Sequence, residues 1–362
     1  MASRSKQAQA NVSDFAAIPV KQEAAPACVT WMVTLGCNRR CPYCFFDVYS
    51  FGANSNDNPP DATFPLGDAI RMVHEMARIG AADLYLTGGE PLLRKDLLEV
   101  IGKASSVRVR SHLVTKYAVS PALARRLAGA GICSVILSLD DARPHAAAAL
   151  AGAPGYLGEA TNAIQALMGA GIPVEVNAVV TKVNVNHLRE LAVYLADVGV
   201  PKLKFSPFSE PYPQRTAAAK LATAGFSELP FAAMQAEFYA RNLEITMGSG
   251  ASSSAPEPCG SMVCEVGTRA LDVMPDGSVS RCHYLTHQRE MFVGSLRYQS
   301  LLDVWNGPSL ASMARPTRTS FEGTTCSSCE GHDGCNARGR CYVSSLQTRE
   351  RLFAPDAFCT RQ

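Results

Sequence analysis

The chain is constrained most by a regular alternation of short apolar runs and amphipathic segments between residues 30 and 206. Six apolar runs, each short enough for one strand, lie at 29–35, 83–90, 110–115, 133–141, 174–180 and 202–208. Segments with apolar residues at three- and four-residue spacing separate them, at 65–80, 95–106, 120–131, 155–171 and 184–199. Strands joined by crossover helices form a parallel sheet, so we expect an α/β domain with ligands at the carboxyl ends of its strands. The sheet is either open and doubly wound or a partial barrel.

The rest of the chain falls into segments of different character. A helical pattern over 231–245 is followed by a linker-like stretch at 247–258, and a hairpin is expected at 270–284, where Pro-Asp-Gly supplies the turn. We therefore expect a flexible N-terminal segment, a barrel core, a connecting segment and a cysteine-rich C-terminal domain, at 1–27, 28–206, 207–258 and 259–362.

Composition limits the partners that this chain can have. The 362 residues are 47% hydrophobic, enough for a sizeable core, and carry 34 basic and 32 acidic side chains, for a net charge of +2. This balance gives no overall field, so we expect neither nucleic acid nor a membrane as a partner. No run approaches the length of a transmembrane helix, and the N-terminus lacks the apolar block of a secretory signal. The sequence thus predicts a cytoplasmic protein.

Thirteen cysteines are many for a cytoplasmic chain, and in a reducing compartment they favour metal binding over disulfides. Three lie in CNRRCPYC, as Cys37, Cys41 and Cys44, and eight lie between residues 259 and 359. A closed zinc or iron–sulfur site takes four ligands. Three local thiols therefore indicate either a remote fourth ligand, as in a zinc site, or a coordination position left open.

The cysteine spacing and a turn one strand later resemble the signature of the radical S-adenosylmethionine superfamily. CNRRCPYC supplies the CxxxCxxC spacing, and LTGGEP at 86–91 supplies the Gly-Gly-Glu turn. The resemblance implies that Cys37, Cys41 and Cys44 hold three irons of a 4Fe-4S cluster. The open iron binds S-adenosylmethionine, which the reduced cluster cleaves to methionine and a 5′-deoxyadenosyl radical. It also implies a partial (β/α)6 barrel of the TIM type and a flavodoxin- or ferredoxin-type reductant.

The same resemblance assigns cofactor-binding residues at successive strand ends. Gly88 and Gly89 allow a close backbone approach to a ligand, Glu90 suits the ammonium group of S-adenosylmethionine, and Tyr43 is expected near its adenine. The arginine that many relatives carry for the methionine carboxylate is absent. The remaining candidates lie in SLDDARPH and NAVVTKVN: Ser138 and Asp140 for methionine or ribose groups, and Asn177 or Lys182 for the carboxylate. Capping of strands and helices is the alternative role of these polar residues.

The C-terminal cysteines resemble the SPASM extension of radical S-adenosylmethionine enzymes, which holds two auxiliary 4Fe-4S clusters. Carried over by position, the first auxiliary cluster takes Cys259, Cys264, Cys282 and Cys341, and the second takes Cys326, Cys329, Cys335 and Cys359. The sequence departs from the usual pattern between Cys335 and Cys341, where five residues, NARGR, stand in place of three. Two zinc sites are the alternative for these eight thiols.

Two residues that follow a predicted ligand are candidates for catalysis. His283 and Tyr284 come directly after Cys282, and in some relatives the residue at that place takes a proton during substrate oxidation. Imidazole has a suitable pKa for a base, although a surface or supporting histidine is the alternative. His287, His332 and Asp333 are weaker candidates, because polar residues beside clusters often serve as hydrogen-bond donors.

The resemblance implies abstraction of a hydrogen atom from a substrate and oxidation of the substrate radical through the auxiliary clusters. Most such relatives modify peptides or proteins, so a ribosomally made peptide is the first expectation. Only 36 residues precede Cys37, too few for a leader-binding domain, so we expect a separate leader-binding protein or a direct peptide groove. The alternatives are a dehydrogenase or epimerase of an aminoglycoside or nucleoside sugar, and a non-catalytic zinc protein.

Overall fold

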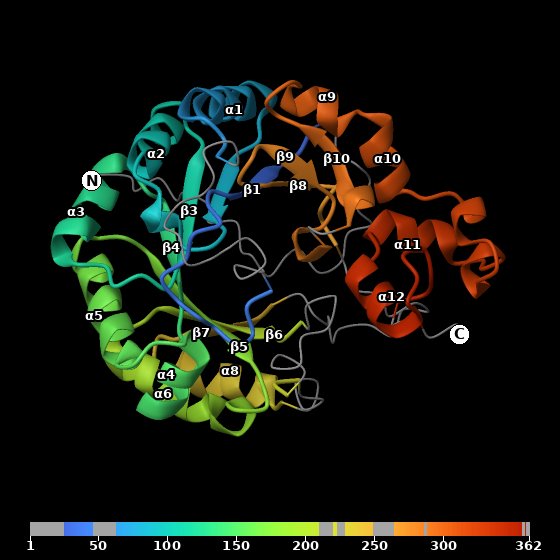
Figure 1. Ribbon diagram of the computed structural model, residues 1–362. Coiled ribbons are helices and arrows are strands. Elements are labelled where there is room, and N and C mark those ends of the chain that lie inside the picture. Colours follow the sequence, from blue (N-terminus) through green and yellow to red (C-terminus); the bar gives the residue numbers. More distant parts are fainter. Residues whose placement is uncertain are drawn as a thin grey trace, which may run out of the picture.

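A computed structural model of the chain describes residues 25–45, 63–209, 220–222, 229–248, 264–285, 288–356 and 359. Its framework is one curved sheet of ten strands with helices along the outside (Figure 1). The strand order is β10-β9-β8-β1-β2-β3-β4-β5-β6-β7. Each pair of neighbouring strands from β8 through β1 to β7 is parallel, and the β8-β9 and β9-β10 pairs are antiparallel. The carboxyl ends of the parallel strands therefore meet at one rim.

The strands are short, as expected for runs between crossover helices. Those of the barrel are β1 (Cys28–Met32), β2 (Asp83–Thr87), β3 (Arg110–Thr115), β4 (Ser134–Ser138), β5 (Val174–Val180), β6 (Lys202–Pro207) and β7 (Glu244–Met247). The C-terminal region adds β8 (Ala270–Val273), β9 (Ser278–Ser280) and β10 (Phe292–Ser295).

The helices follow the strands in regular alternation. The barrel carries α1 (Leu66–Ile79), α2 (Leu97–Ser106), α3 (Pro121–Ala130), α4 (Pro144–Ala151), α5 (Tyr156–Gly169), α6 (Leu188–Val198) and α8 (Phe231–Tyr239). The C-terminal region carries α9 (Leu301–Trp305), α10 (Pro308–Ala314), α11 (His332–Arg338) and α12 (Tyr342–Arg349). Short 3-10 turns are η3 (Pro91–Leu93), η4 (Val185–His187), η5 (His283–Leu285), η6 (Arg289–Met291), η7 (Arg318–Phe321) and η8 (Thr325–Ser327).

The predicted partial barrel is confirmed, and the doubly wound alternative is wrong. All six predicted strands and all five predicted helices are present, and the helices lie on one side of the curved sheet (Figure 1). Helix α4 is additional, in the alanine-rich stretch between β4 and α5. The predicted helix over 231–245 is longer than the observed one, because α8 ends at Tyr239 and β7 begins at Glu244. Residues 249–258 of the linker-like stretch lie outside the described residues.

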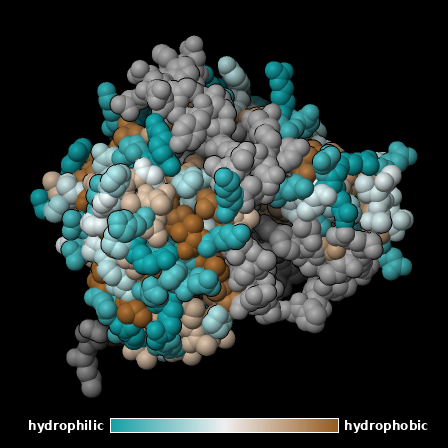
Figure 2. Space-filling model, turned by 60° about the horizontal axis from the view of Figure 1, so that its bottom comes forward, coloured by the Kyte–Doolittle hydropathy of each residue, from teal (hydrophilic) through white to brown (hydrophobic). Residues whose placement is uncertain are grey.

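The core lies between the sheet and its outer helices. Along β5 every second residue is buried, from Val174 to Val180, and the other strands of the barrel alternate in the same way. The buried set faces α1 to α6, as the amphipathic patterns require. On the face shown in Figure 2, hydrophilic side chains dominate the described surface of the barrel, and hydrophobic ones form small separate groups. Among the described residues, no helix has the length and apolar character to cross a bilayer.

The C-terminal region is joined to the barrel through the sheet itself. Strand β8 pairs in parallel with β1, with Cys28 opposite Ala270 and Trp31 opposite Val273. The predicted hairpin is confirmed as the antiparallel β8-β9 pair, whose connection contains Pro275, Asp276 and Gly277. The sheet therefore extends beyond the predicted core of 28–206 on both sides, with β7 at one edge and β8 to β10 at the other.

Polar side chains of β2, β3 and β4 form a chain on the inner side of the barrel. Asp83 accepts hydrogen bonds from Arg110 Nε at 2.6 Å and from His112 Nε2 at 2.9 Å. The other ring nitrogen of His112 lies 2.8 Å from Ser134 Oγ, and its ring stacks on Tyr85. Burial alone raises the pKa of Asp83, but the hydrogen bonds from His112 and Arg110 outweigh it and lower the value to about 2.

This lowered pKa predicts acid sensitivity of the fold. A carboxyl group with a depressed pKa in the folded state stabilises it above the unfolded value of 3.8, and this stabilisation is lost as the pH falls to about 2. At a partly exposed site the contribution is on the order of 1–2 kcal/mol. Asp83→Asn should therefore unfold more easily than the parent at pH 7, with a difference that shrinks towards pH 2. Urea unfolding at pH 7, 4 and 2.5 measures it; a constant difference at all three values would contradict the assignment.

Candidate functional site

The cysteine triplet lies in the loop that leaves the carboxyl end of β1. Cys37, Cys41 and Cys44 are free thiols, each partly exposed. The thiols lie near enough to one another that a negative charge on Cys44 raises the pKa of both Cys37 and Cys41. Burial is the larger cause, and it brings the pKa of Cys37 to about 11 and that of Cys41 to about 12. Such thiols lose their protons when a cation binds, as an iron site requires.

The Gly-Gly-Glu turn packs directly against the cysteine loop. Gly89 N donates to Thr34 O at 2.8 Å, and Glu90 N donates to Gly36 O at 2.7 Å. A Cβ on Gly89 would lie 2.1 Å from Gly36 O, and one on Gly88, whose φ is +127°, would lie 2.7 Å from Thr34 O. The two glycines therefore let two backbone segments meet. Their predicted contact with a ligand stays a prediction.

Glu90 is held by protein donors within this turn. Its side chain is buried, and its carboxylate accepts from Leu92 N at 3.1 Å, Thr115 Oγ1 at 2.7 Å and Lys116 N at 3.0 Å. Burial raises the pKa of Glu90, and these hydrogen bonds oppose the rise. The contacts fix the carboxylate between the ends of β2 and β3. Its predicted contact with an ammonium group is untested.

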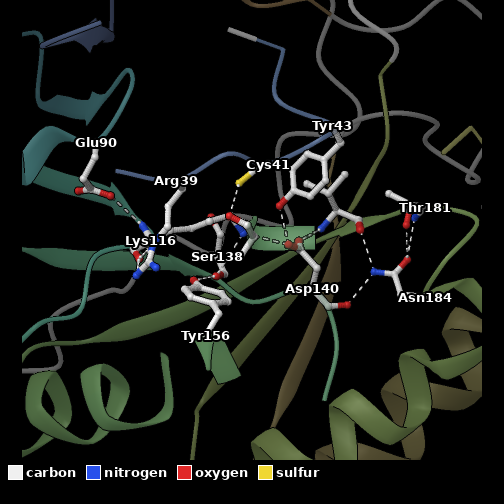
Figure 3. A network of polar contacts seen from close by, with 12 residues as sticks. Arg39, Cys41, Tyr43, Glu90, Lys116, Ser138, Asp140, Tyr156, Thr181 and Asn184 are labelled. Carbon is white, nitrogen blue, oxygen red and sulfur yellow. Dashed lines mark hydrogen bonds and ion pairs between the residues drawn. The ribbon is translucent and has the colours of Figure 1, made fainter. Parts of the chain in front are cut away.

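Asp140 is the centre of a buried polar network that joins three strand ends to the cysteine loop (Figure 3). Its Oδ2 accepts from Tyr43 Oη at 2.5 Å and from Lys116 Nζ at 2.9 Å, and its Oδ1 accepts from Val179 N at 2.9 Å. Asp140 is 1% exposed. Burial raises the pKa of Tyr43, and the Asp140 carboxylate raises it further, so this hydroxyl stays protonated as a donor.

Lys116 is a site residue that the sequence reasoning missed. It follows β3, and its ammonium lies 2.9 Å from Asp140 Oδ2 and 3.4 Å from the carbonyl oxygen of Ser138 (Figure 3). Burial lowers the pKa of Lys116, but attraction to Asp140 outweighs burial and holds the value well above the usual range. The rings of Tyr43 and Tyr156 lie within 5.5 Å of Nζ, where a cation is attracted to an aromatic face. Lys116 thus adds a buried positive charge to the site, beside that of Arg39.

The other polar candidates occupy different places. The carbonyl of Ser138 accepts from Tyr156 Oη, and Asn177 Oδ1 accepts from Ser206 Oγ at 2.7 Å. Lys182 is exposed. Asn184, which was not singled out, is 1% exposed and donates to Asp140 O at 2.6 Å, so it ties the ends of β4 and β5 together. The structure brings Ser138 and Asp140 to the network of Figure 3. Asn177 lies on β5, opposite Ser138 of β4 and Lys204 of β6.

Three of the four cysteines assigned to the first auxiliary cluster come together. Cys264, Cys282 and Cys341 lie close enough that a charge on Cys264 raises the pKa of the other two, although burial is the larger cause. Burial brings the pKa of Cys341 to about 11. The guanidinium of Arg281 lies beside this set, with Nη1 3.0 Å from Cys264 Sγ. Cys259, the fourth predicted ligand, lies outside the described residues.

The four cysteines assigned to the second auxiliary cluster line one small cavity. They are Cys326, Cys329, Cys335 and Cys359, and His332, Arg340, Pro355 and Asp356 complete the wall. His332 is 3% exposed, its Nδ1 lies 3.1 Å from Asp333 Oδ1, and its Nε2 has no hydrogen-bond partner among the described residues. A larger cavity, of about 680 Å³, lies between α3 and α5 on the outer side of the barrel and has no cysteine in its wall.

His283 and Tyr284 lie between the cysteine triplet and the first auxiliary set. The ring of Phe45, next to Cys44, lies 5.1 Å from that of His283 and 4.4 Å from that of Tyr284. Burial raises the pKa of the Tyr284 hydroxyl, and negative charges on Cys282 and Cys44 raise it further. Asp272, a buried residue of β8, lies 2.5 Å from His283 Nδ1. This contact ties Nδ1 of the His283 ring to the Asp272 carboxylate. His287 lies outside the described residues.

The donor sets fit iron–sulfur clusters. In a cubane cluster each cysteine binds a different iron, so the sulfurs stand farther apart than the ligands of one zinc ion. Within the described ranges, no three His, Cys, Asp or Glu side chains are placed to hold a single metal ion. The four cysteines around one cavity supply the four thiols that a closed cluster takes, and His332, whose Nε2 has no hydrogen-bond partner in the described chain, lies in the cavity wall.

Comparison with known proteins gives matches over nearly the whole chain. A family model described as the Radical SAM superfamily matches residues 31–195, and one described as an iron-sulfur cluster-binding domain, SPASM, matches residues 264–330. Mycofactocin maturase MftC of Mycobacterium ulcerans is 27% identical over 349 residues, which cover 93% of this chain and 88% of the relative. PqqA peptide cyclase of Methylocella silvestris is 27% identical over 345 residues, which cover 87% of this chain and 82% of the relative.

Among solved structures, SuiB of Streptococcus suis bound to S-adenosylmethionine has the same fold. Its TM-score is 0.72 at 19% identity, over 93% of this chain and 78% of that chain. The first family model contains the cysteine triplet and the Gly-Gly-Glu turn, and the second contains Cys264, Cys282, Cys326 and Cys329. The chain therefore belongs to the radical S-adenosylmethionine superfamily, as an enzyme that uses a 4Fe-4S cluster and S-adenosylmethionine and carries an iron–sulfur cluster-binding SPASM domain.

Proposed function

We propose that this enzyme removes a hydrogen atom from a peptide substrate and oxidises the resulting radical with the help of two auxiliary clusters. The observation that carries the proposal is the contact of Phe45 with His283 and Tyr284, which brings the cysteine triplet next to the first auxiliary set. The peptide is favoured because PqqA peptide cyclase resembles this chain over 82% of its own length. The proposed reductant is a flavodoxin or ferredoxin, and the peptide is recognised either by a separate leader-binding protein or in a direct groove.

The proposed function assigns a role to each group of site residues. Cys37, Cys41 and Cys44 would hold the open cluster, which with S-adenosylmethionine would supply the chemistry that removes the hydrogen atom. Two C-terminal sets of cysteines would hold the auxiliary clusters. The first set is Cys259, Cys264, Cys282 and Cys341, and the second is Cys326, Cys329, Cys335 and Cys359. His283, oriented by Asp272, takes the proton that leaves the substrate, and Tyr284 lines the same space.

Lys116 is the residue that we assign to the methionine carboxylate. Its ammonium has three donors, of which two go to Asp140 and Ser138, and it lies on the same strand-end network as Tyr43, which belongs to the cysteine loop. A buried cation is the group that an anionic carboxylate needs. We prefer Lys116 to Asn177 and Lys182, because the Asn177 Oδ1 accepts a hydrogen bond from Ser206 Oγ and Lys182 is exposed.

Removal of the cysteine triplet tests the open cluster. The Cys37/Cys41/Cys44→Ala protein, purified anaerobically, should hold about eight irons in place of about twelve and should form no 5′-deoxyadenosine after reduction. Cys133→Ala, which changes a thiol outside both groups, is the control and should match the parent. Iron, sulfide and zinc analysis together with chromatography of the nucleoside measures this. Stoichiometric zinc with little iron in the parent would contradict the proposal.

Lys116→Met should weaken binding of S-adenosylmethionine by about tenfold or more, because a hydrogen bond between charged groups contributes about 1.5–3 kcal/mol. Lys182→Met removes an exposed lysine that follows β5, two strands from β3, and should leave the affinity unchanged. Equilibrium dialysis of the anaerobic proteins with labelled S-adenosylmethionine gives both affinities, and circular dichroism checks their folding. Equal affinity in parent and Lys116→Met, or weakening in Lys182→Met alone, would contradict the assignment.

The peptide class is tested with a short peptide encoded beside the gene of this enzyme. The reconstituted protein, S-adenosylmethionine and a flavodoxin reducing system should change the mass of that peptide and form 5′-deoxyadenosine in proportion to product. The same assay with an aminoglycoside or a nucleoside sugar should give only background nucleoside. Turnover of the sugar and none of the peptide would contradict the peptide class and favour the small-molecule reaction.

A further inference from the structure

Arg281 is a buried cation beside the first auxiliary set, and its charge has no carboxylate partner among the described residues. It is 1% exposed, directly precedes Cys282, and its Nη1 lies 3.0 Å from Cys264 Sγ. Its Nε and Nη2 are buried without a hydrogen-bond partner in the described part of the chain. The guanidinium also lies 5.5 Å from the ring centre of Tyr342, which follows Cys341.

Other buried arginines of the described chain are paired with oxygen. Arg39 donates to Lys116 O and to the carboxylate of Glu159, and Arg94 donates to Asp96. Arg340, near the second set, donates to Asn336 Oδ1 at 2.7 Å and to a backbone carbonyl. Arg340 also lies 3.8 Å from Cys326 Sγ, but the Arg281 side chain differs because a sulfur is its only acceptor within the described residues. A buried guanidinium costs several kcal/mol unless charge and hydrogen bonds compensate it.

We propose that Arg281 donates hydrogen bonds to the sulfur atoms of the first auxiliary cluster and raises its reduction potential. This inference rests on the proposed function, which assigns Cys264, Cys282 and Cys341 to that cluster. The thiolates of these cysteines give the cluster a net negative charge, and this charge compensates the charge of the guanidinium. The two unpartnered N–H groups then have acceptors, because cluster and thiolate sulfurs accept hydrogen bonds.

The direction of the effect follows from charge. Reduction adds one electron to the cluster, which becomes more negative, and breaks no bond. Arginine keeps its proton throughout, so no proton moves with the electron. A fixed positive charge and its hydrogen bonds stabilise the more negative state, and this raises the reduction potential. Arg281 therefore makes the cluster a better acceptor for an electron and is a positioning and tuning residue, not a catalytic one.

The test is a redox titration of the auxiliary clusters. The parent for this experiment is the full chain with Cys37/Cys41/Cys44→Ala, which leaves only the two auxiliary clusters. The anaerobic protein is titrated with dithionite and mediators and followed by electron paramagnetic resonance. Arg281→Met should lower one of the two midpoint potentials and leave the other unchanged. Arg281→Lys should stay closer to the parent than Arg281→Met does, because it keeps the charge.

Controls separate this effect from misfolding and from a general change in net charge. Arg241→Met removes the same unit of charge at the β7 edge, where Arg241 pairs with Asp197, and should move neither potential. If Arg281→Met loses iron, Arg281→Gln keeps a donor without the charge, and its potential should also fall. Unchanged potentials in a neutral variant with full iron content would overturn this inference alone. A parent without auxiliary clusters would overturn the proposed function and this inference together.

Discussion

The close approach of two backbone segments is the constraint on which the rest of the site depends. Gly89 and Glu90 donate their backbone N–H groups to the cysteine loop, and Cβ atoms at Gly88 and Gly89 would lie within 2.7 Å of its carbonyl oxygens. Because real Cβ atoms do not come that close to oxygen, side chains here would push the loop away. The loop carries Tyr43, so displacement would also open the hydrogen bond to Asp140 and expose the buried Lys116.

Periodicity predicted the barrel well and failed where the signal was short or non-local. Helix α4 was missed because PHAAAALA has no contrast between polar and apolar faces. The end of α8 was missed because NLEI continues an apolar spacing, although Asn242 takes a positive φ and the chain turns into β7. The pairing of β8 with β1 joins segments more than two hundred residues apart, and a local pattern carries no information on such a pair.

The candidate site was predictable where a motif fixes the ligands and was missed where a role depends on neighbours distant in sequence. The spacing of Cys37, Cys41 and Cys44 is visible in eight residues. Lys116, in contrast, gains its position from Asp140 at the end of the neighbouring strand, and Arg281 gains its environment from Cys264 and Tyr342. Each is one basic residue among 34 in the sequence, and only its burial together with these contacts distinguishes it.

The shared sheet explains how two groups of cysteines can keep a fixed separation. Domains joined by a flexible linker usually move relative to each other. Here β8 hydrogen-bonds to β1, so the hairpin that leads to Cys282 belongs to the same sheet as the strand that leads to Cys37. Phe45, His283 and Tyr284 fill the space between them. Because electron transfer depends on distance, a continuous sheet is a better support for two redox groups than two separate domains would be.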